Sequence, residues 1–203
     1  MIAIVDYDIG NIAAVSNMLM RLGIRSVVTS SAQEIESASK IILPGNGSFD
    51  ACMKNLRESG LVPVLEEKVL GQKTPLLGIC VGAQMLGTQS AEGEESGLGW
   101  LDMQVKKFPD IAGLRVPHMG WNEVWSENKS NALLDHMDAD ARFYFVHSYY
   151  MVPNNFEDIL LRAKYGIEFA AGVSRGNISG VQFHPEKSHR FGKQLLSSFA
   201  RGL

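Results

Sequence analysis

Residues 75–84, with the sequence PLLGICVGAQ, restrict the fold of this 203-residue chain more than any other stretch. Residues 76–79 form an unbroken run of apolar residues and glycine that leads into Cys80, and Gly82 and Ala83 follow closely. A continuous apolar run of this length is typical of a strand buried on both faces of a parallel sheet. Small residues directly after the strand allow a sharp, strained turn into a helix, which we expect over residues 82–87.

Cys80 has two possible roles in such a stretch. In a strand-to-helix turn its side chain projects above the sheet, and the amide end of the following helix favours the thiolate. A free cysteine is also among the most buried residue types, so Cys80 could be a small residue of the core. The stretch alone leaves both roles open.

The first part of the chain alternates between strand and helix patterns. Short apolar runs predict strands, and apolar residues at helical spacing predict the helices between them. The strands are expected at residues 2–5, 27–28 and 41–43, and the helices at residues 12–22, 32–38 and 48–59. This alternation predicts an α/β fold with a doubly wound, mostly parallel sheet flanked by helices.

Several polar or glycine-rich segments follow these strands. Residues 8–11 are expected to turn the chain into its first helix, and Pro44 is expected to end the third strand. Ligands bind beyond the carboxyl ends of the strands in a sheet of this kind. Asp8, residues 45–47 and Cys80 all fall at such ends, so a site is expected there.

The second part of the chain loses this alternation. Residues 101–150 predict an antiparallel extension with a short helix near residues 132–136, and the acidic residues 92–95 predict a solvated loop. Residues 187–203 predict a closing amphipathic helix. Because no linker rich in Pro, Ser or Gly interrupts the chain, we expect a single domain over residues 1–203.

Composition excludes several classes of function. A formal net charge of −3 gives no indication of nucleic acid or an anionic membrane as a partner. No apolar run approaches the roughly 18 residues of a membrane span, and the N-terminus lacks the features of a signal peptide. The two cysteines, Cys52 and Cys80, form no disulfide framework, and Cys52 is expected in the core. These features predict a cytoplasmic protein.

His184 and Glu186 supply what a nucleophilic cysteine requires. A short apolar stretch leads into His184, and Glu186 follows two positions later, after Pro185. Such a cysteine needs a base to accept its proton and a third group to orient the base. An isolated His-Pro-Glu segment is more often a surface turn, but its combination with the Cys80 stretch favours a Cys-His-Glu triad. His147 lies in a strongly β-prone aromatic run, where a structural role is the more common one.

These motifs resemble those of a known enzyme family. The Cys80 stretch, together with Phe183-His184-Pro185-Glu186, is similar to the class I (triad) glutamine amidotransferases. Within that family, three further stretches resemble the glutaminase subunits of imidazole glycerol phosphate synthase: PGNGSF at residues 44–49, VPHMGWN at residues 116–122 and YFVHSY at residues 144–149. The resemblance runs from Asp6 to the C-terminus.

The resemblance implies roles for further residues. The glycine-flanked loop at residues 45–47 could be a plain tight turn, but in the family it helps to form the oxyanion hole. The amides of Gly47 and Val81 are therefore expected to donate to the oxyanion, and Gln84, Ser148 and Tyr149 to bind L-glutamine. Asn46 replaces the small apolar residue usual in the family, and its tolerance of positive φ suggests that the loop flips easily. The resemblance implies neither a metal nor an organic cofactor.

The resemblance also implies a partner. Residues 117–122 combine residue types that anchor interfaces, although a half-buried turn at a sheet edge is an alternative for this segment. Pro117, Met119, Trp121 and Asn122 are expected to contact a cyclase subunit with a (β/α)8 barrel, which uses the ammonia in histidine biosynthesis. His118 is not expected to bind a metal, since no second ligand stands at zinc spacing.

Two alternatives remain open. Paralogues in the family feed ammonia to a sugar amidotransferase in surface-polysaccharide assembly. Residues 187–192, and Asp8 in place of the usual glycine, weakly resemble that branch. The fold could also serve a non-catalytic or peptidase-like role, against which the presence of Cys80, His184 and Glu186 together argues.

Overall fold

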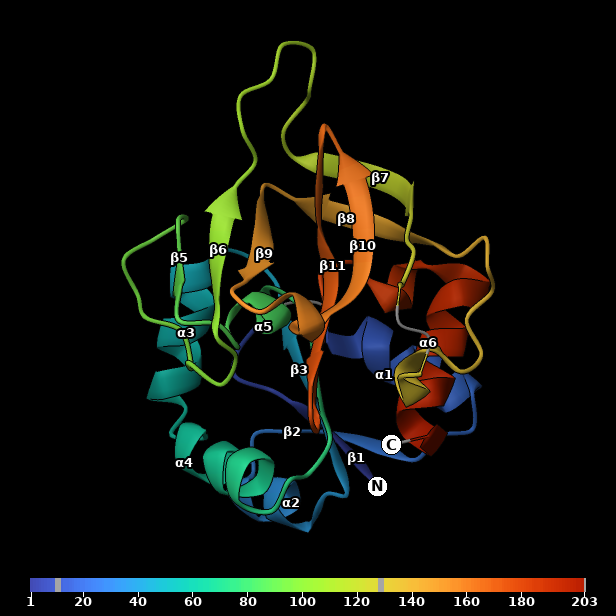
Figure 1. Cartoon of the computed structure of the whole chain (residues 1–203). Coiled ribbons are helices and arrows are strands. Elements are labelled where there is room, and N and C mark those ends of the chain that lie inside the picture. Colours follow the sequence, from blue (N-terminus) through green and yellow to red (C-terminus); the bar gives the residue numbers. More distant parts are fainter. Residues whose placement is uncertain (10–11, 128–129, 203) are drawn as a thin grey trace.

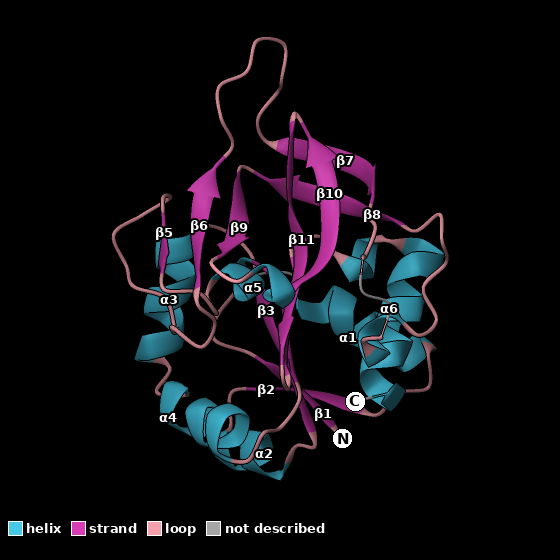
Figure 2. Cartoon of the chain, in the orientation of Figure 1, coloured by secondary structure: helices cyan, strands magenta, loops and turns pink. Residues whose placement is uncertain are grey.

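The computed structural model describes residues 1–9, 12–127 and 130–202, and within these ranges ten strands form one central sheet. The strands lie in the order β2-β1-β3-β4-β12-β11-β9-β6-β5, with β10 paired to β11 beside this path. Helices flank this sheet (Figures 1 and 2). The predicted α/β class, with a doubly wound sheet and an antiparallel extension, is confirmed.

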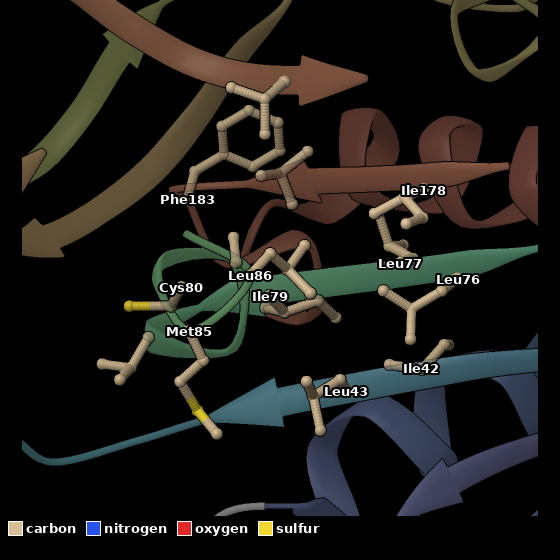
Figure 3. Close-up of a cluster of buried hydrophobic side chains, with 14 of the residues drawn as sticks. Ile42, Leu43, Leu76, Leu77, Ile79, Cys80, Met85, Leu86, Ile178 and Phe183 are labelled. Atoms are coloured by element: carbon tan, nitrogen blue, oxygen red, sulfur yellow. The ribbon is translucent and has the colours of Figure 1, made fainter. Parts of the chain in front are cut away.

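Five strands form the parallel half of the sheet, and they are β2 (Ser26–Thr29), β1 (Ile2–Val5), β3 (Lys40–Gly45), β4 (Leu76–Cys80) and β12 (Ile178–Val181). Every residue of β1, β3, β4 and β12 is buried. Helices on both faces remove these strands from water, which explains why their sequences are continuous apolar runs without alternation. Figure 3 shows Cys80 at one end of a cluster of apolar side chains from β3 and β4.

The other half of the central sheet is mainly antiparallel. It consists of β11 (Ile167–Arg175), β9 (Tyr149–Pro153), β6 (Met103–Lys107), β5 (Gln89–Ser90) and β10 (Ile159–Tyr165), with β5 parallel to β6. A separate antiparallel pair, β7 (His118–Glu123) and β8 (Arg142–His147), lies beside β10 near the top of the view in Figure 1. The extension is larger than the sequence predicts, since β10 and β11 were not expected.

Helices α1 (Ile12–Arg21) and α6 (His189–Gly202) lie on one side of the sheet in Figure 1, and α2 (Ala32–Ser37), α3 (Phe49–Glu58) and α4 (Val62–Glu66) lie on the other. Lys40 Nζ donates to the carbonyls of Phe199 at 2.8 Å and Ala200 at 2.9 Å, which satisfies acceptors at the end of α6. Short helical turns complete the chain, and they are η1 (Glu67–Gly71), η2 (Ala132–Leu134), η3 (Phe156–Asp158) and η4 (Pro185–Lys187).

Three sequence predictions need correction. Strand β3 continues through Pro44 to Gly45, because a proline can pair with β4 through its carbonyl. The helix expected at residues 82–87 is the single turn α5 (Val81–Gln84). Beyond this turn the amides of Leu86 and Gly87 bond to carbonyls only three residues back, at Ala83 and Gln84. The carbonyls of Met85, Leu86 and Gly87 accept from the amides of residues 98, 101 and 99. The expected helix near residues 132–136 is the three-residue η2.

Some predicted features lie at the edges of the described ranges. Asp8 adopts a φ of 65°, but the expected turn at residues 8–11 includes Gly10 and Asn11, which lie outside the described residues. The predicted closing helix is confirmed as α6, although Leu203 also lies outside them. Among the described residues, no helix has the length and apolar character needed to cross a bilayer.

Candidate active site

Cys80 lies where β4 turns into α5, in a strained backbone conformation with φ 55° and ψ −116°. A non-glycine residue adopts such angles only where the surroundings impose them, as in a nucleophile elbow. The small neighbours are required by space. A Cβ atom on Gly78 would lie 2.7 Å from the Cα of Ala83, and one on Gly82 would lie 2.0 Å from the carbonyl oxygen of Leu43. The predicted sharp turn around Cys80 is thus confirmed.

His184 and Glu186 form a buried pair in the same region. The Nδ1 atom of His184 lies 2.7 Å from Glu186 Oε1, and both side chains are less than 10% exposed, at 7% and 3%. Strand β12 ends at Val181, so His184 is held instead by a hydrogen bond from its amide to the Tyr144 carbonyl at 2.9 Å. Helix α6 packs closely on η4, since a Cβ on Gly192 would lie 1.8 Å from the Pro185 carbonyl oxygen.

The environment of His184 favours the imidazolium. Burial by itself lowers the pKa of His184, but hydrogen bonds to Cys80 and Glu186, together with their charges, raise the pKa to about 10. The Glu186 carboxylate accepts a hydrogen bond from Nδ1, which leaves Nε2 as the ring nitrogen available to Cys80. This arrangement can store a proton on His184 while Cys80 is a thiolate.

The triad opens into a cavity of about 260 Å³. The predicted oxyanion donors and substrate-binding residues all line this cavity, together with two members of the triad, and they are Gly47, Val81, Gln84, Ser148, Tyr149, Cys80 and His184. They come from four separate parts of the chain. The remaining lining residues include Asn46, Glu92, Pro117 and His147, of which only Asn46 was considered for a role in the glutamine site.

The loop after β3 is fixed from the core side. Tyr7 Oη donates to the Pro44 carbonyl at 2.5 Å, and Cys52 Sγ lies 3.4 Å from the Asn46 carbonyl. Cys52 is buried in α3, as expected. Positive φ occurs at Gly47, at 103°, and not at Asn46. In this conformation, therefore, Asn46 does not adopt the positive φ that asparagine tolerates.

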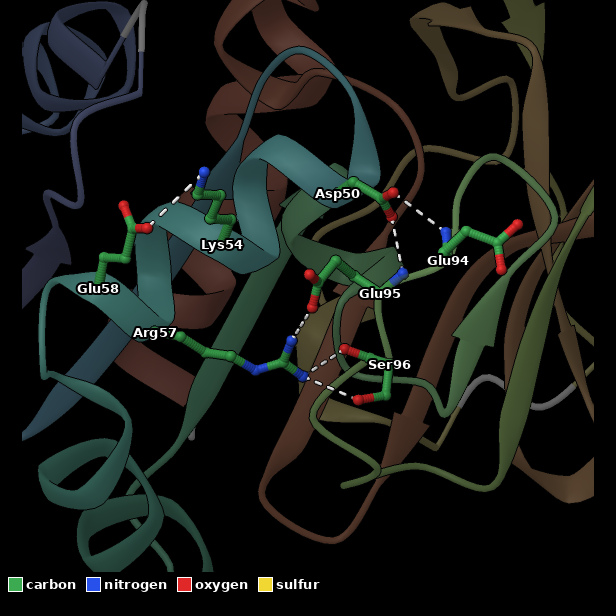
Figure 4. A network of polar contacts seen from close by, with 7 residues as sticks. All are labelled: Asp50, Lys54, Arg57, Glu58, Glu94, Glu95 and Ser96. Carbon is green, nitrogen blue, oxygen red and sulfur yellow. Dashed lines mark hydrogen bonds and ion pairs between the residues drawn. The ribbon is translucent and has the colours of Figure 1, made fainter.

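Two functional candidates were missed by the sequence. The loop at residues 92–95 is not freely solvated, because Glu92 lines the cavity and accepts a hydrogen bond from the Phe49 amide at 2.8 Å. Figure 4 shows how α3 holds this loop: Asp50 accepts from the amides of Glu94 and Glu95, and Arg57 bonds to Glu95 and Ser96. The acidic sequence itself gave no signal of this contact.

Gln182 is the second missed residue. Its side chain is fully buried, accepts from Gln84 Nε2 at 3.0 Å and approaches Cys80 Sγ with Nε2 at 3.9 Å. A glutamine between Val181 and Phe183, both buried apolar residues, was a readable signal, since a buried amide requires partners.

Strand β7 presents an exposed apolar face beside the cavity. Met119 is 61% exposed and Trp121 is 45% exposed, while Pro117 is exposed and also lines the cavity. Trp121 stacks on His189, with ring centroids 5.5 Å apart and planes at 4°. Asn122 points to the opposite side of β7, where its amide donates to the Lys164 carbonyl at 2.9 Å.

Comparisons with known proteins agree with this geometry. Residues 3–202 match the family model described as glutamine amidotransferase class-I. The chain is 52% identical over 199 residues to a Pseudomonas aeruginosa protein named imidazole glycerol phosphate synthase subunit HisH 2, an alignment that covers 98% of each chain. It is 49% identical over 203 residues to the HisH subunit of Bdellovibrio bacteriovorus, with 98% of this chain and 99% of that protein covered.

Solved structures show the same fold. PurLQS from Thermotoga maritima superposes with a TM-score of 0.74 over 98% of this chain and 96% of that chain, and its 19% identity limits the likeness to the fold. The match to the family model and the full-length similarity to the HisH subunits show the family as well as the fold. The chain belongs to the class I glutamine amidotransferase family.

Proposed function

We propose that this chain is the glutaminase subunit of an imidazole glycerol phosphate synthase, which hydrolyses L-glutamine at Cys80 and passes the ammonia to a cyclase partner. The observation that carries the proposal is the position of Cys80, on a strained turn and in the same cavity lining as a His184 that is itself paired with Glu186. The full-length similarity to HisH subunits supports the choice of pathway.

The geometry supports a thioester mechanism. The Cys80 thiolate attacks the side-chain carbonyl carbon of glutamine, and the carbonyl electrons move onto oxygen to give a tetrahedral oxyanion. As the intermediate collapses, the carbon–nitrogen bond breaks and His184 donates its proton to the departing ammonia. Water then attacks the thioester while His184 accepts a proton, and glutamate leaves as the thiolate re-forms.

The other lining residues have roles that fit their chemistry. The amides of Gly47 and Val81 are proposed to stabilise the oxyanion, and Gln84, Ser148 and Tyr149 to position the substrate. Glu92 adds a carboxylate to the cavity, which suits the α-ammonium group of glutamine.

The partner is proposed to dock on β7. Ammonia released into bulk water becomes protonated and is lost, so the acceptor site must connect to the cavity without passing through solvent. Pro117 lines the cavity, and Met119 and Trp121 expose apolar surface next to it. An apolar anchor of this kind is typical of the middle of an interface.

Adding the HisF-type cyclase subunit and its nucleotide ligand should raise glutamate formation well above the rate of the chain alone. Trp121→Ala should weaken the complex by about 2 kcal/mol, which is roughly 30-fold in affinity. It should also lower the yield of product per glutamate. Titration calorimetry and the glutamate-to-product ratio measure both effects. Glu66→Gln, an exposed change on α4, is the matched control. Equal glutamine turnover with and without the partner would refute the expected activation of the glutaminase by the partner.

A sugar amidotransferase stays a second candidate for the partner. The residues that suggest this branch include His189, and His189 stacks on Trp121 at the proposed docking face. Sequence differences between the two branches at residues 187–192 would therefore lie at the surface where the partner is proposed to bind. Comparing ammonia transfer to a cyclase and to a sugar amidotransferase from the same genome decides between the two.

The proton held by His184 sets the alkaline limit of activity. Because the pKa of His184 is raised to about 10, the imidazolium that protonates the departing nitrogen, so that it leaves as ammonia, persists up to that pH and is lost above it. Glu186→Gln removes one charge that raises this pKa, so the alkaline limb of kcat/KM should move down by about 1 pH unit or more. Rate profiles between neutral pH and the alkaline limit check this, with Glu66→Gln as control. An unmoved limb in Glu186→Gln would refute the orienting role of Glu186.

A further inference from the structure

A second pair of histidines lies buried outside the triad. His118 on β7 and His147 on β8 face each other in register, and His118 Nδ1 lies 3.0 Å from His147 Nε2. Both side chains are almost fully buried. His118 is stacked between Phe145, with centroids 4.7 Å apart, and Tyr165, with centroids 4.0 Å apart. A pair so enclosed must satisfy its own hydrogen bonds.

The partners of the two rings fix where each proton lies. His147 Nδ1 is 2.7 Å from the Tyr149 carbonyl, which can only accept, so this nitrogen carries hydrogen. In a neutral His147 ring, Nε2 carries no hydrogen and therefore accepts a hydrogen bond from His118 Nδ1. In a neutral His118 ring, Nε2 must then also act as an acceptor. Asn122 Nδ2, a donor, lies 3.3 Å from it. Every link thus donates in one direction, from Asn122 to the Tyr149 carbonyl.

The surroundings keep both rings uncharged. Burial lowers the pKa of His118 to about 4. Burial also lowers the pKa of His147, and the nearby His118 and His184 lower it further. The hydrogen bond to the Tyr149 carbonyl raises this pKa by less than burial lowers it, and the pKa of His147 is about 3. The directed chain therefore persists at neutral pH.

Each end of the chain reaches a different functional surface. The Tyr149 carbonyl also accepts from Gln84 Nε2 at 3.2 Å, and both residues line the cavity. Gln84 continues through Gln182 to Cys80. At the other end, His118 and Asn122 occupy the inner face of β7, whose outer face exposes Met119 and Trp121. The hydrogen-bond chain therefore connects β7 to the glutamine cavity.

We propose that His118 and His147 are positioning residues for glutamine, which hold the Tyr149 carbonyl and Gln84 in place through this directed hydrogen-bond chain. The proposal rests on the proposed glutaminase function. The two histidines do not touch the reacting atoms in this role. They fix the geometry of groups that bind the substrate, so their loss should weaken recognition of glutamine-shaped molecules and leave the thiol itself reactive.

Two alkylating probes, applied to the full-length protein, separate an effect on glutamine recognition from an effect on thiol reactivity. Acivicin, a glutamine-shaped electrophile, reports the cavity, and iodoacetamide reports the thiol of Cys80; peptide mass spectrometry locates each adduct. His118→Phe keeps a flat ring between Phe145 and Tyr165 but removes the donor to His147. His118→Asn restores a donor, because its Nδ2 occupies the position of Nδ1.

In His118→Phe, the acivicin concentration for half-maximal modification should rise about 10-fold, while the iodoacetamide rate stays within about two-fold of wild type. His118→Asn should recover most of the loss. Equal acivicin response in His118→Phe and wild type overturns the positioning role, as does a loss that His118→Asn does not repair. A parallel fall in both probe rates points to a general structural role and also overturns it. Failure of the wild type to show saturable acivicin modification at Cys80 instead refutes the proposed function, and the positioning role falls with it.

Discussion

Cys80→Ala should lower glutamine hydrolysis by about 10³-fold or more, because the thioester can form only on this sulfur. Alanine removes one atom from a side chain that is 5% exposed and tolerates the positive φ no worse than cysteine does. The fold should therefore remain, with an unchanged circular dichroism spectrum. Glutamate formation with the partner present measures the loss, and product formation from added ammonia should persist.

Cys52→Ala is the matched control, since Cys52 is the other buried cysteine of the chain. Its thiol contacts the core side of the loop after β3, at the Asn46 carbonyl. This variant should keep more than about a tenth of the wild-type rate, because no donor to the oxyanion is removed. A full glutamine-dependent rate in Cys80→Ala would refute the nucleophile assignment.

The parallel half of the fold could be predicted because its sequence signal is local. Strands such as β1 and β4 are buried on both faces, so their residues must be apolar without alternation. Helix α6 was equally readable, since Phe191, Leu195 and Phe199 recur on one face and are all buried. In each case one element's own residues carry the pattern.

The antiparallel part was harder because its signal depends on distant partners. Strand β11 contains five successive buried residues but ends in Ser174 and Arg175, and only its pairing with β10 and β12 makes it a strand. The segment after α5 also depends on a distant partner. Its carbonyls bond to residues 98–101, a contact that no local pattern reveals.

The site divides in the same way. Cys80, His184 and Glu186 could be predicted as a triad because a nucleophile, a base and an orienting acid have characteristic neighbours in the sequence, and the structure places His184 and Glu186 together as a buried pair. No local sequence pattern indicates Glu92 or the His118–His147 pair. Glu92 is positioned by its hydrogen bond to the start of α3, and the two histidines meet because β7 and β8 pair in register. Histidines in a β-prone aromatic run are usually structural, and nothing in that run indicates the hydrogen bonds by which His147 connects His118 to the Tyr149 carbonyl.

Gly82→Ala should reduce both stability and activity, because β3 and the turn after Cys80 approach too closely for a side chain. A Cβ on Gly82 would lie 2.0 Å from the Leu43 carbonyl oxygen, and one on Gly45 would lie 2.1 Å from the Gly82 amide nitrogen. These are backbone atoms of the buried strand β3 and the buried turn α5, so no flexible side chain can move aside. The turn itself must shift by roughly 1 Å, and a displacement of that size at a nucleophile costs about 10²-fold in rate.

We expect Gly82→Ala to lower the free energy of unfolding by about 3 kcal/mol and the glutaminase rate by about 10²-fold. Urea unfolding and glutamate formation measure the two effects. Gly202→Ala in α6 is the matched control, since its Cβ would meet neighbours only at an ordinary 3.5 Å and should change neither quantity. A cooperative urea transition in Gly82→Ala shows that the variant is folded, which separates a displaced nucleophile from an unfolded chain. Wild-type turnover in a folded Gly82→Ala would mean that the turn adapts without moving Cys80, and the close approach to β3 would then have no part in placing the nucleophile.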